Sequence, residues 1–148
     1  MKLKIGDKAP DFKTQNQRGE TVKLKDLKGQ KVALYFYPQD DTPTCTNQAC
    51  NLRDNYEMLI SKGFAIYGIS PDGVKDHLKF IKKFDLPFDL LTDEDLTIAN
   101  KYGVWAEKVN FGRRYMGIVR STFIIEKGII TNIIGKVFSQ KHAAQVMK

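Results

Sequence analysis

The feature that most limits how this chain can fold is a continuous apolar run at residues 32–37, Val-Ala-Leu-Tyr-Phe-Tyr. Gly29 and Pro38 bound the run on its two sides. A short run that is apolar at every position is typical of a strand covered on both faces of its sheet. Such a strand requires other segments packed on each face. We therefore predict an α/β fold with residues 32–37 as a central strand.

The pattern of apolar and turn-forming residues predicts the elements around this strand. Further strands are expected at residues 12–15, 21–24, 64–70, 88–91, 117–125 and 129–137, with the first pair and the last pair each forming a hairpin. Helices are expected at residues 43–61, 74–84, 93–101 and 139–147, with one helical turn between Leu24 and Gly29. We interpret the less periodic residues 104–115 as a surface loop. Strands that alternate with helices predict a mixed central sheet flanked by helices, in a single domain over residues 1–148.

Composition limits the classes of protein to consider. Hydrophobic residues make up 42% and charged residues 28% of the chain, as in ordinary globular proteins. No apolar run approaches the roughly 20 residues that span a bilayer, and no signal peptide is evident, so we expect a cytoplasmic protein that does not bind membranes. The net charge of +7 comes from scattered lysines without a nucleic-acid-binding motif. We interpret it as a solvated surface and expect no nucleic-acid partner.

Both cysteines of the chain, Cys45 and Cys50, follow the apolar run closely. A helix is expected to begin at Pro43, which lacks the amide hydrogen that is unpaired in a first turn, and Asp41 or Thr42 can cap it. Cys45 then lies in the first turn, where free amide groups and the helix dipole favour the thiolate, the nucleophilic form of cysteine. We expect an oxidisable nucleophile at Cys45, with a small buried cysteine as the alternative.

Metal binding is the other chemistry open to two cysteines. A closed zinc site needs about four ligands, and the only histidines, His77 and His142, stand alone and far away in the sequence. We interpret both as surface residues of their helices and expect no metal. A structural disulfide framework is not expected from two cysteines without a secretion signal. The favoured interpretation is a redox-active pair.

The spacing of the two cysteines has a geometric consequence. Positions five apart on an α-helix are turned by roughly 140° and raised by ~7.5 Å, which puts their Cα atoms roughly 8.7 Å apart. A disulfide needs Cα atoms within about 7 Å. Cys45 and Cys50 therefore cannot bond while their helix is intact. If they do bond, oxidation is coupled to local unfolding of the helix.

Several motifs along the chain point to a known family. They are Gly6-Asp7-Lys8-Ala9-Pro10-Asp11-Phe12, Phe36-Tyr37-Pro38, Pro38-x3-Thr42-x2-Cys45 with Cys50 five residues later, Asn51-Leu52-Arg53-Asp54, Gly68-Ile69-Ser70, Lys101-Tyr102-Gly103-Val104-Trp105 and Arg120-Ser121-Thr122-Phe123. In these motifs the chain resembles the peroxiredoxins, most of all the bacterioferritin comigratory protein or PrxQ group, over essentially its whole length. The resemblance implies a thioredoxin-like fold with an N-terminal extension, in agreement with the α/β prediction.

The resemblance also implies an activity, that of a thiol-dependent peroxidase acting on hydrogen peroxide and organic hydroperoxides. Cys45 would be the peroxidatic cysteine, whose thiolate attacks the O–O bond and becomes a sulfenic acid. Cys50 would resolve it as an intramolecular disulfide, which thioredoxin or a similar dithiol reduces. Thr42 would orient the peroxide, and Arg120 would stabilise the thiolate and the leaving oxygen. No metal, haem or flavin is implied, and the group is often monomeric or weakly dimeric.

The expected substrate pocket departs from the family pattern at two positions. Pro38 and Pro43 would shape the pocket, and Thr44 stands where the family usually has glycine. This β-branched residue narrows the allowed backbone angles and adds a side chain beside the thiol. Gln48 replaces the usual glutamate and removes a carboxylate from the helix. We expect altered electrostatics in the pocket without loss of activity. These departures leave rate and substrate preference open, and the reaction class is unchanged.

Two other hypotheses belong to different functional classes. A thiol–disulfide oxidoreductase or redox sensor on the same fold would exchange disulfides with negligible peroxide turnover, although the usual Cys-x-x-Cys is absent. A basic nucleic-acid-binding or chaperone-like protein would carry its cysteines incidentally. Arg120 alone, without the resemblance, would be interpreted as a surface residue at the end of a strand.

Overall fold

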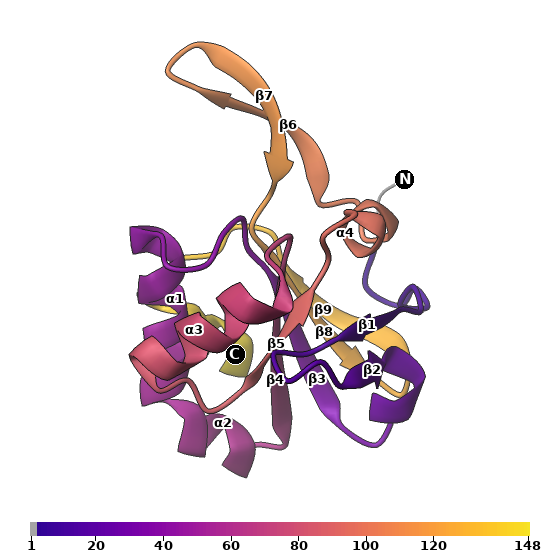
Figure 1. The fold of residues 1–148 in the computed structure, drawn as a ribbon. Helices are drawn as coiled ribbons and strands as arrows, with labels where there is room; N and C mark the ends of the chain where they lie inside the picture. The colour runs from indigo at the N-terminus through magenta and orange to yellow at the C-terminus, as the bar shows by residue number, and fades with distance from the viewer. Residues whose placement is uncertain (1–2) are drawn as a thin grey trace.

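The central sheet is mixed and is formed by five strands in the described part of the chain. The computed structural model describes residues 3–148, except the side chain of Asn110. The strands are β3 (Lys31–Phe36), β4 (Phe64–Ser70), β5 (Asp89–Thr92), β8 (Ser121–Glu126) and β9 (Ile129–Ile134), in the order β5-β4-β3-β8-β9 (Figure 1). β3 pairs parallel with β4 and antiparallel with β8. The predicted α/β fold with a mixed sheet is confirmed.

Helices and the N-terminal segment cover the two faces of this sheet (Figure 1). The helices are α1 (Pro43–Asp54), α2 (Tyr56–Ser61), α3 (Val74–Phe84), α4 (Thr97–Lys101) and α5 (His142–Met147). Ala33 and Tyr35 of β3 pack in one core with residues of α1, α2, α3 and α5. Val32 and Leu34 pack on the opposite side with residues of α4 and the N-terminal segment. Every residue from 32 to 37 is at most 1% exposed, so the predicted two-sided strand is confirmed.

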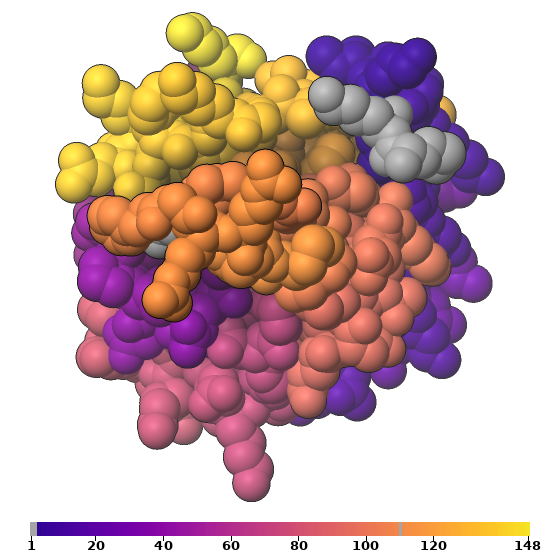
Figure 2. Space-filling model, turned by 90° about the horizontal axis from the view of Figure 1, so that it is seen from above, coloured from indigo at the N-terminus to yellow at the C-terminus, as the bar shows by residue number. Residues whose placement is uncertain are grey.

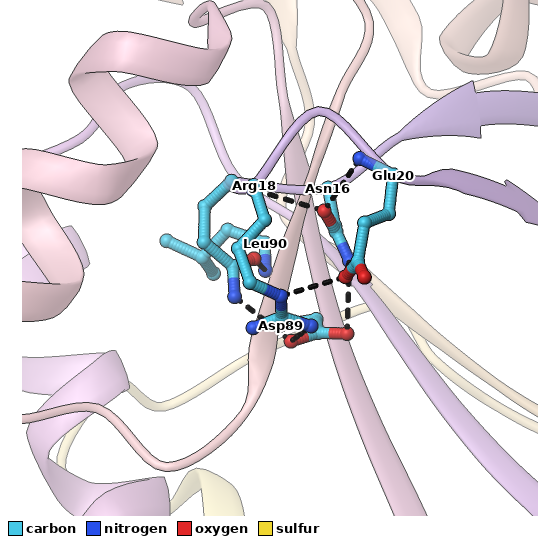
Figure 3. Close-up of polar contacts among 6 residues, drawn as sticks. Asn16, Arg18, Glu20, Asp89 and Leu90 are labelled. Carbon is cyan, nitrogen blue, oxygen red and sulfur yellow. Dashed lines mark hydrogen bonds and ion pairs between the residues drawn. The ribbon is translucent and has the colours of Figure 1, made fainter.

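The N-terminal extension is a hairpin of β1 (Lys13–Gln15) and β2 (Thr21–Lys23), followed by a 3₁₀ turn, η1 (Leu24–Leu27). Its loop covers the free edge of β5, which would otherwise expose unpaired backbone groups. The Gln17 side chain accepts a hydrogen bond from the Leu90 amide at 3.1 Å and donates to Asp89 at 2.9 Å. Asn16 and Arg18 also turn their side chains toward Asp89 (Figure 3).

The helix predicted at residues 43–61 is divided into α1 and α2. The break falls at Asn55, whose backbone leaves the helical region at φ −110° and ψ 15°. The Asn55 side chain donates to the Asn51 carbonyl oxygen at 2.8 Å. Asparagine side chains compete with the backbone for such carbonyls, which is why they disfavour helix interiors.

Residues 104–115, predicted as a surface loop, contain most of a hairpin instead. β6 (Trp105–Asn110) pairs antiparallel with β7 (Arg113–Ile118), and the hairpin projects from the body of the molecule (Figure 1). Phe111 and Gly112 form its turn with φ of 52° and 75°. Two-residue hairpin turns of this kind usually contain Asn-Gly. Phenylalanine at the first position is not typical of such a turn, so the sequence does not predict the hairpin.

No described helix is long and apolar enough to cross a membrane.

Candidate active site

The turn between β3 and α1 places the start of the helix where the sequence predicts it. Pro43 is the first helical residue, and Thr42 precedes it in an extended conformation at φ −89° and ψ 154°. The Thr42 carbonyl oxygen accepts the first helical hydrogen bond, from the Thr46 amide at 2.8 Å. The Thr42 hydroxyl donates to the Gln39 carbonyl oxygen at 3.1 Å and does not cap the helix. Its oxygen lone pairs therefore remain available to a ligand.

Cys45 lies in the first turn of α1 on the side that faces the core. It is 2% exposed and packs with Ala49 and Leu52, whereas Cys50 is half-buried. Both are free thiols on one continuous helix. The helical geometry that separates positions five apart therefore applies to this pair, and the two sulfurs cannot bond until α1 opens.

Arg120 reaches α1 from the short connector between β7 and β8. Its Nη1 donates to Gln48 Oε1 at 3.0 Å. Gln48 follows Cys45 by three residues, so the two side chains are neighbours on one face of the helix. The connector is held at its start by the Val119 amide, which donates to the Val104 carbonyl oxygen at 2.8 Å. The structure thus brings Arg120 to the cysteine-bearing face of α1 through Gln48.

The remaining predicted pocket residues lie around the turn. Pro38 follows β3 and is half-buried, whereas Pro43 and Thr44 are exposed at the start of α1. Thr44 therefore points away from the core, on the solvent side of the first turn. Among the described residues, no hydrogen bond joins Thr42 to Arg120.

His142, predicted to be a surface residue, is fully buried, and that prediction is wrong. It begins α5, whose inward face packs against α1 and the sheet. Its Nδ1 contacts Gln48 Nε2 at 3.2 Å, and its Nε2 contacts the Thr122 hydroxyl at 2.7 Å. Burial and the nearby charge of Arg120 lower the pKa of His142 to about 4.

His77 is also fully buried, and its predicted surface position is wrong as well. It shares the inward face of α3 with Phe80, three residues later, a helical spacing that the sequence displays. His77 Nε2 donates to the Leu91 carbonyl oxygen at 2.8 Å, and Nδ1 lies 2.6 Å from Asp40 Oδ2. Asp40 belongs to the turn before α1, so His77 connects that turn to α3.

Asp40 has further contacts that fix the turn. Its Oδ1 accepts a hydrogen bond from the Tyr37 hydroxyl, and its backbone amide donates to Asp72 Oδ2 at 2.7 Å. Burial raises the pKa of the Asp40 carboxyl, although hydrogen bonds from His77 and Tyr37 oppose that rise. Asp40, Asp72 and His77 also present three possible metal-ligand atoms within 4.8 Å of one another. Because hydrogen bonds already engage these atoms, we interpret the group as a polar network that holds the turn.

Two more side chains near the thiol were not identified from the sequence. Lys108 of β6 donates to the Ile118 carbonyl oxygen at 2.9 Å, and its pKa is lowered by burial and by Arg120, against a smaller opposite effect of Cys45. In Figure 2 the hairpin of β6 and β7 lies in front of the β3–α1 region. Tyr35 lies on the sheet face that shares a core with Cys45. Its buried hydroxyl has no hydrogen-bond partner among the described residues.

Comparisons with known proteins add a family and several relatives. A family model described as the AhpC/TSA family matches residues 5–133. The putative peroxiredoxin Bcp of Coxiella burnetii is 47% identical over 148 residues, covering 99% of this chain and 98% of the relative. Peroxiredoxin Bcp of Bacillus subtilis is 46% identical, covering 100% and 95%. The structure of the Xanthomonas campestris bacterioferritin comigratory protein, studied for its alkyl peroxide reduction activity, superposes with a TM-score of 0.88 at 29% identity, covering 98% and 93%.

Proposed function

The chain belongs to the AhpC/TSA family, among its Bcp peroxiredoxins, and from this premise we propose that it is a thiol-dependent peroxidase whose reacting group is Cys45. The observation that carries the assignment is the position of Cys45 in the first turn of α1, with Arg120 bound to Gln48 on the same helix face. The helix N-terminus supplies free amide groups and a dipole that favour a thiolate. The arginine supplies a planar cation with several donors.

In the first step the Cys45 thiolate attacks one peroxide oxygen, and the O–O bond breaks. The sulfur becomes a sulfenic acid, and the other oxygen leaves as water or an alcohol after it takes up a proton. Arg120 stabilises the negative charge that moves from sulfur to the leaving oxygen. Thr42 orients the peroxide with its hydroxyl, while Pro38, Pro43 and Thr44 border the entry to the thiol. We assign these roles from the position of each residue and the family pattern.

In the second step Cys50 resolves the sulfenic acid. Its thiol condenses with Cys45–SOH, which forms the disulfide and releases one water. The residues between the two cysteines must leave the helix for this bond to form. A dithiol, for which we propose thioredoxin, then restores both thiols by exchange.

The substrate range and setting complete the proposal. We propose both hydrogen peroxide and alkyl hydroperoxides as substrates, supported by the alkyl peroxide activity of the Xanthomonas campestris relative. We place the reaction in the cytoplasm, where thiols are kept reduced. We treat residues 1–148 as one domain that acts as a monomer or weak dimer, without nucleic-acid or membrane partners.

Intact-protein mass spectrometry after one equivalent of hydrogen peroxide tests this assignment. The expected product has lost two hydrogen atoms, and peptide mapping should join Cys45 to Cys50. The Cys50→Ser variant should stop at a sulfenic acid on Cys45, and Cys45→Ser should not react. Peroxide turnover at the wild-type rate by Cys45→Ser would refute the assignment.

A further inference from the structure

The hydrogen bonds around Gln48 determine where the proton of His142 lies. A guanidinium only donates hydrogen bonds, so the group that faces Arg120 must be the carbonyl oxygen of the Gln48 amide. The amide nitrogen then faces His142 Nδ1, and this nitrogen also only donates. His142 Nδ1 must therefore be an unprotonated acceptor. The ring proton lies on Nε2, which donates to the Thr122 hydroxyl.

The same chain of contacts excludes a second proton from the ring. A proton on Nδ1 would face the NH₂ group of Gln48, and turning the amide over would put that NH₂ group against Arg120. The other groups that face His142 do not compensate an added charge. Tyr35 contributes a ring in T-shaped contact with the imidazole, with centroids 5.3 Å apart, and Thr122 contributes a hydroxyl. Arg120 is a cation, and the preceding Lys141 is an exposed cation. The depressed pKa of His142 agrees with this geometry.

A glutamate in place of Gln48 would behave in the opposite way. Both carboxylate oxygens accept hydrogen bonds, so one could bind Arg120 while the other accepts a proton-bearing Nδ1 from His142. Gln48 is thus the residue that makes this network exclude a proton. The presence of Gln48, where the family usually has glutamate, therefore keeps His142 uncharged in the closed helix.

The contacts of Gln48 with Arg120 and His142 are also the main side-chain attachment of the helical turns between the two cysteines. These turns must open before the cysteines can pair. Among the described side chains of residues 43–50, Gln48 is the one that hydrogen-bonds outside α1. The segments on either side are attached more firmly. Asp40 binds His77 and Asp72 before the helix. After Cys50, Asn51 binds the backbone of Gln140 and Ala143 at 3.0 and 2.8 Å.

We propose that Gln48 and His142 position Arg120 on the closed helix as a proton-excluding network, and that forming the Cys45–Cys50 disulfide opens this network and lets His142 take up a proton. Gln48 lies between the two cysteines, so it leaves the helix when they pair and withdraws its NH₂ group from Nδ1. This inference rests on the proposed resolving role of Cys50. It adds two positioning residues and a proton to that reaction.

The coupled step releases one water and takes up one proton. Cys45–SOH and the Cys50 thiol form one S–S bond and one water, and the proton that His142 binds comes from solvent. If His142 returns from a pKa of about 4 to its ordinary 6.5 in the open form, opening is favoured roughly thirtyfold more at pH 5 than at pH 8. Acid then favours the disulfide form, and neutral pH favours the closed, peroxide-reactive form.

The test is an NMR titration of the imidazole ¹⁵N and ¹H signals in the full chain, which contains two histidines. His142→Asn assigns the signals. In the reduced protein the proposal predicts the Nε2–H form of His142 and a midpoint near 4. In the disulfide form it predicts a midpoint shifted upward by more than one pH unit. Peroxide-treated Cys50→Ser is the matched control, because Cys45 is oxidised there without pairing, and its midpoint should stay near the reduced value.

Four results separate the possible failures. An Nδ1–H form of His142 in the reduced protein would overturn the proton-excluding network. Equal midpoints in the reduced and disulfide forms would overturn the coupling to oxidation. If peroxide yields no disulfide, the resolving role in the proposed function fails, and the bond formed with diamide still tests the network by the same titration. In Gln48→Glu the reduced protein should show His142 charged at neutral pH, and an unshifted midpoint there would contradict the role of Gln48.

Discussion

His77 and His142 are equally buried, and both contact the segment that carries Cys45. Their hydrogen-bond partners nevertheless have opposite effects: those of His77 accept a proton from Nδ1, and that of His142 excludes one. Both ring nitrogens of His77 face acceptors, the Asp40 carboxylate and the Leu91 carbonyl oxygen. A proton must therefore lie between His77 Nδ1 and Asp40 Oδ2, 2.6 Å apart. His142 instead presents Nδ1 to a donor, the NH₂ group of Gln48. Hydrogen-bond partners, rather than burial alone, decide whether a buried histidine holds or excludes a proton.

The two histidines also attach parts of the segment that differ in their role. His77 holds the turn before α1, which in the proposed mechanism keeps its place so that Thr42 can orient a peroxide. His142 holds the turns that, in the proposed mechanism, open so that Cys45 can reach Cys50. The firmer attachment is on the fixed part, and the attachment through one amide is on the moving part. Substitutions at Asp40, His142 and Gln48 each change one member of this pair of attachments, and Tyr35→Phe changes a neighbour of His142.

The largest effect is expected at Asp40. Asp40→Ala leaves His77 Nδ1 and the Tyr37 hydroxyl buried without their partner, which should lower the free energy of unfolding by about 3 kcal/mol. Asp40→Asn is the matched control, because its NH₂ group can donate to a neutral His77 and its carbonyl oxygen can accept from Tyr37. Urea unfolding should show most of the stability restored in Asp40→Asn. Equal stability of Asp40→Ala and wild type would contradict the anchoring role.

The stability of the protein should fall in acid because of His142. Its pKa is about 4 when folded, below the ordinary value of 6.5, so the unfolded chain binds more protons between these values. This contribution is fully present above pH 6.5 and is lost as the pH falls toward 4. The raised pKa of Asp40 acts in the other direction, since its contribution is lost as the pH rises above its ordinary 3.8.

His142→Asn isolates the acid effect, because asparagine can accept from Gln48 and does not titrate. Urea unfolding at pH 7 and pH 4.5 should show wild type losing roughly 2 kcal/mol more than the variant between the two conditions. The same acid loss in both proteins would mean that another group is responsible.

Gln48→Met keeps the bulk of the side chain and removes its amide. Arg120 and His142 then lose their shared partner, which should cost about 1–2 kcal/mol. The two chemical steps should respond oppositely in stopped-flow experiments. Reaction with peroxide should slow about tenfold because Arg120 is no longer held, and disulfide formation should accelerate because the turns open more easily. Slowing of both steps would argue against Gln48 as the attachment that limits opening.

The smallest effect is expected at Tyr35, whose buried hydroxyl has no partner among the described residues. Tyr35→Phe removes a desolvated polar group and leaves the ring contacts with His142 and Tyr37. Thermal unfolding should show the variant as stable as wild type or up to about 1 kcal/mol more stable. A loss above about 1 kcal/mol would reveal a hydrogen bond that the closed structure does not contain.

Much of this architecture follows from local sequence patterns. The apolar run predicts β3, and the position of Pro43 predicts the start of α1, because strand burial and first-turn chemistry depend on neighbouring residues. Residues 64–70 and 74–84 match β4 and α3 for the same reason. Sequence patterns do not predict the hairpin of β6 and β7, because phenylalanine at Phe111 occupies a turn position where asparagine is usual.

The candidate site likewise contains residues placed by local sequence and residues brought together by tertiary packing. Cys45 and Thr42 are neighbours in the sequence, so their placement at the helix start follows from local chemistry. Arg120, Gln48 and His142 meet only through tertiary packing, and no spacing within the chain encodes that contact. Arg120 was identified through resemblance alone. The sequence predicts His142 at the surface because a lone polar residue in a short helix gives no sign of a buried partner.

The measurement that tests the account most directly is amide hydrogen exchange, followed by mass spectrometry, on the reduced and disulfide forms. We expect faster exchange in the disulfide form for residues 43–50. Residues 74–84 of α3 should keep their protection because the attachment of Asp40 to His77 stays intact, and residues 142–147 should keep theirs because Asn51 still binds α5. Unchanged protection at residues 43–50, or equal loss of protection in α3, would contradict a moving segment that is released at Gln48 and is held on its two sides by Asp40 and Asn51.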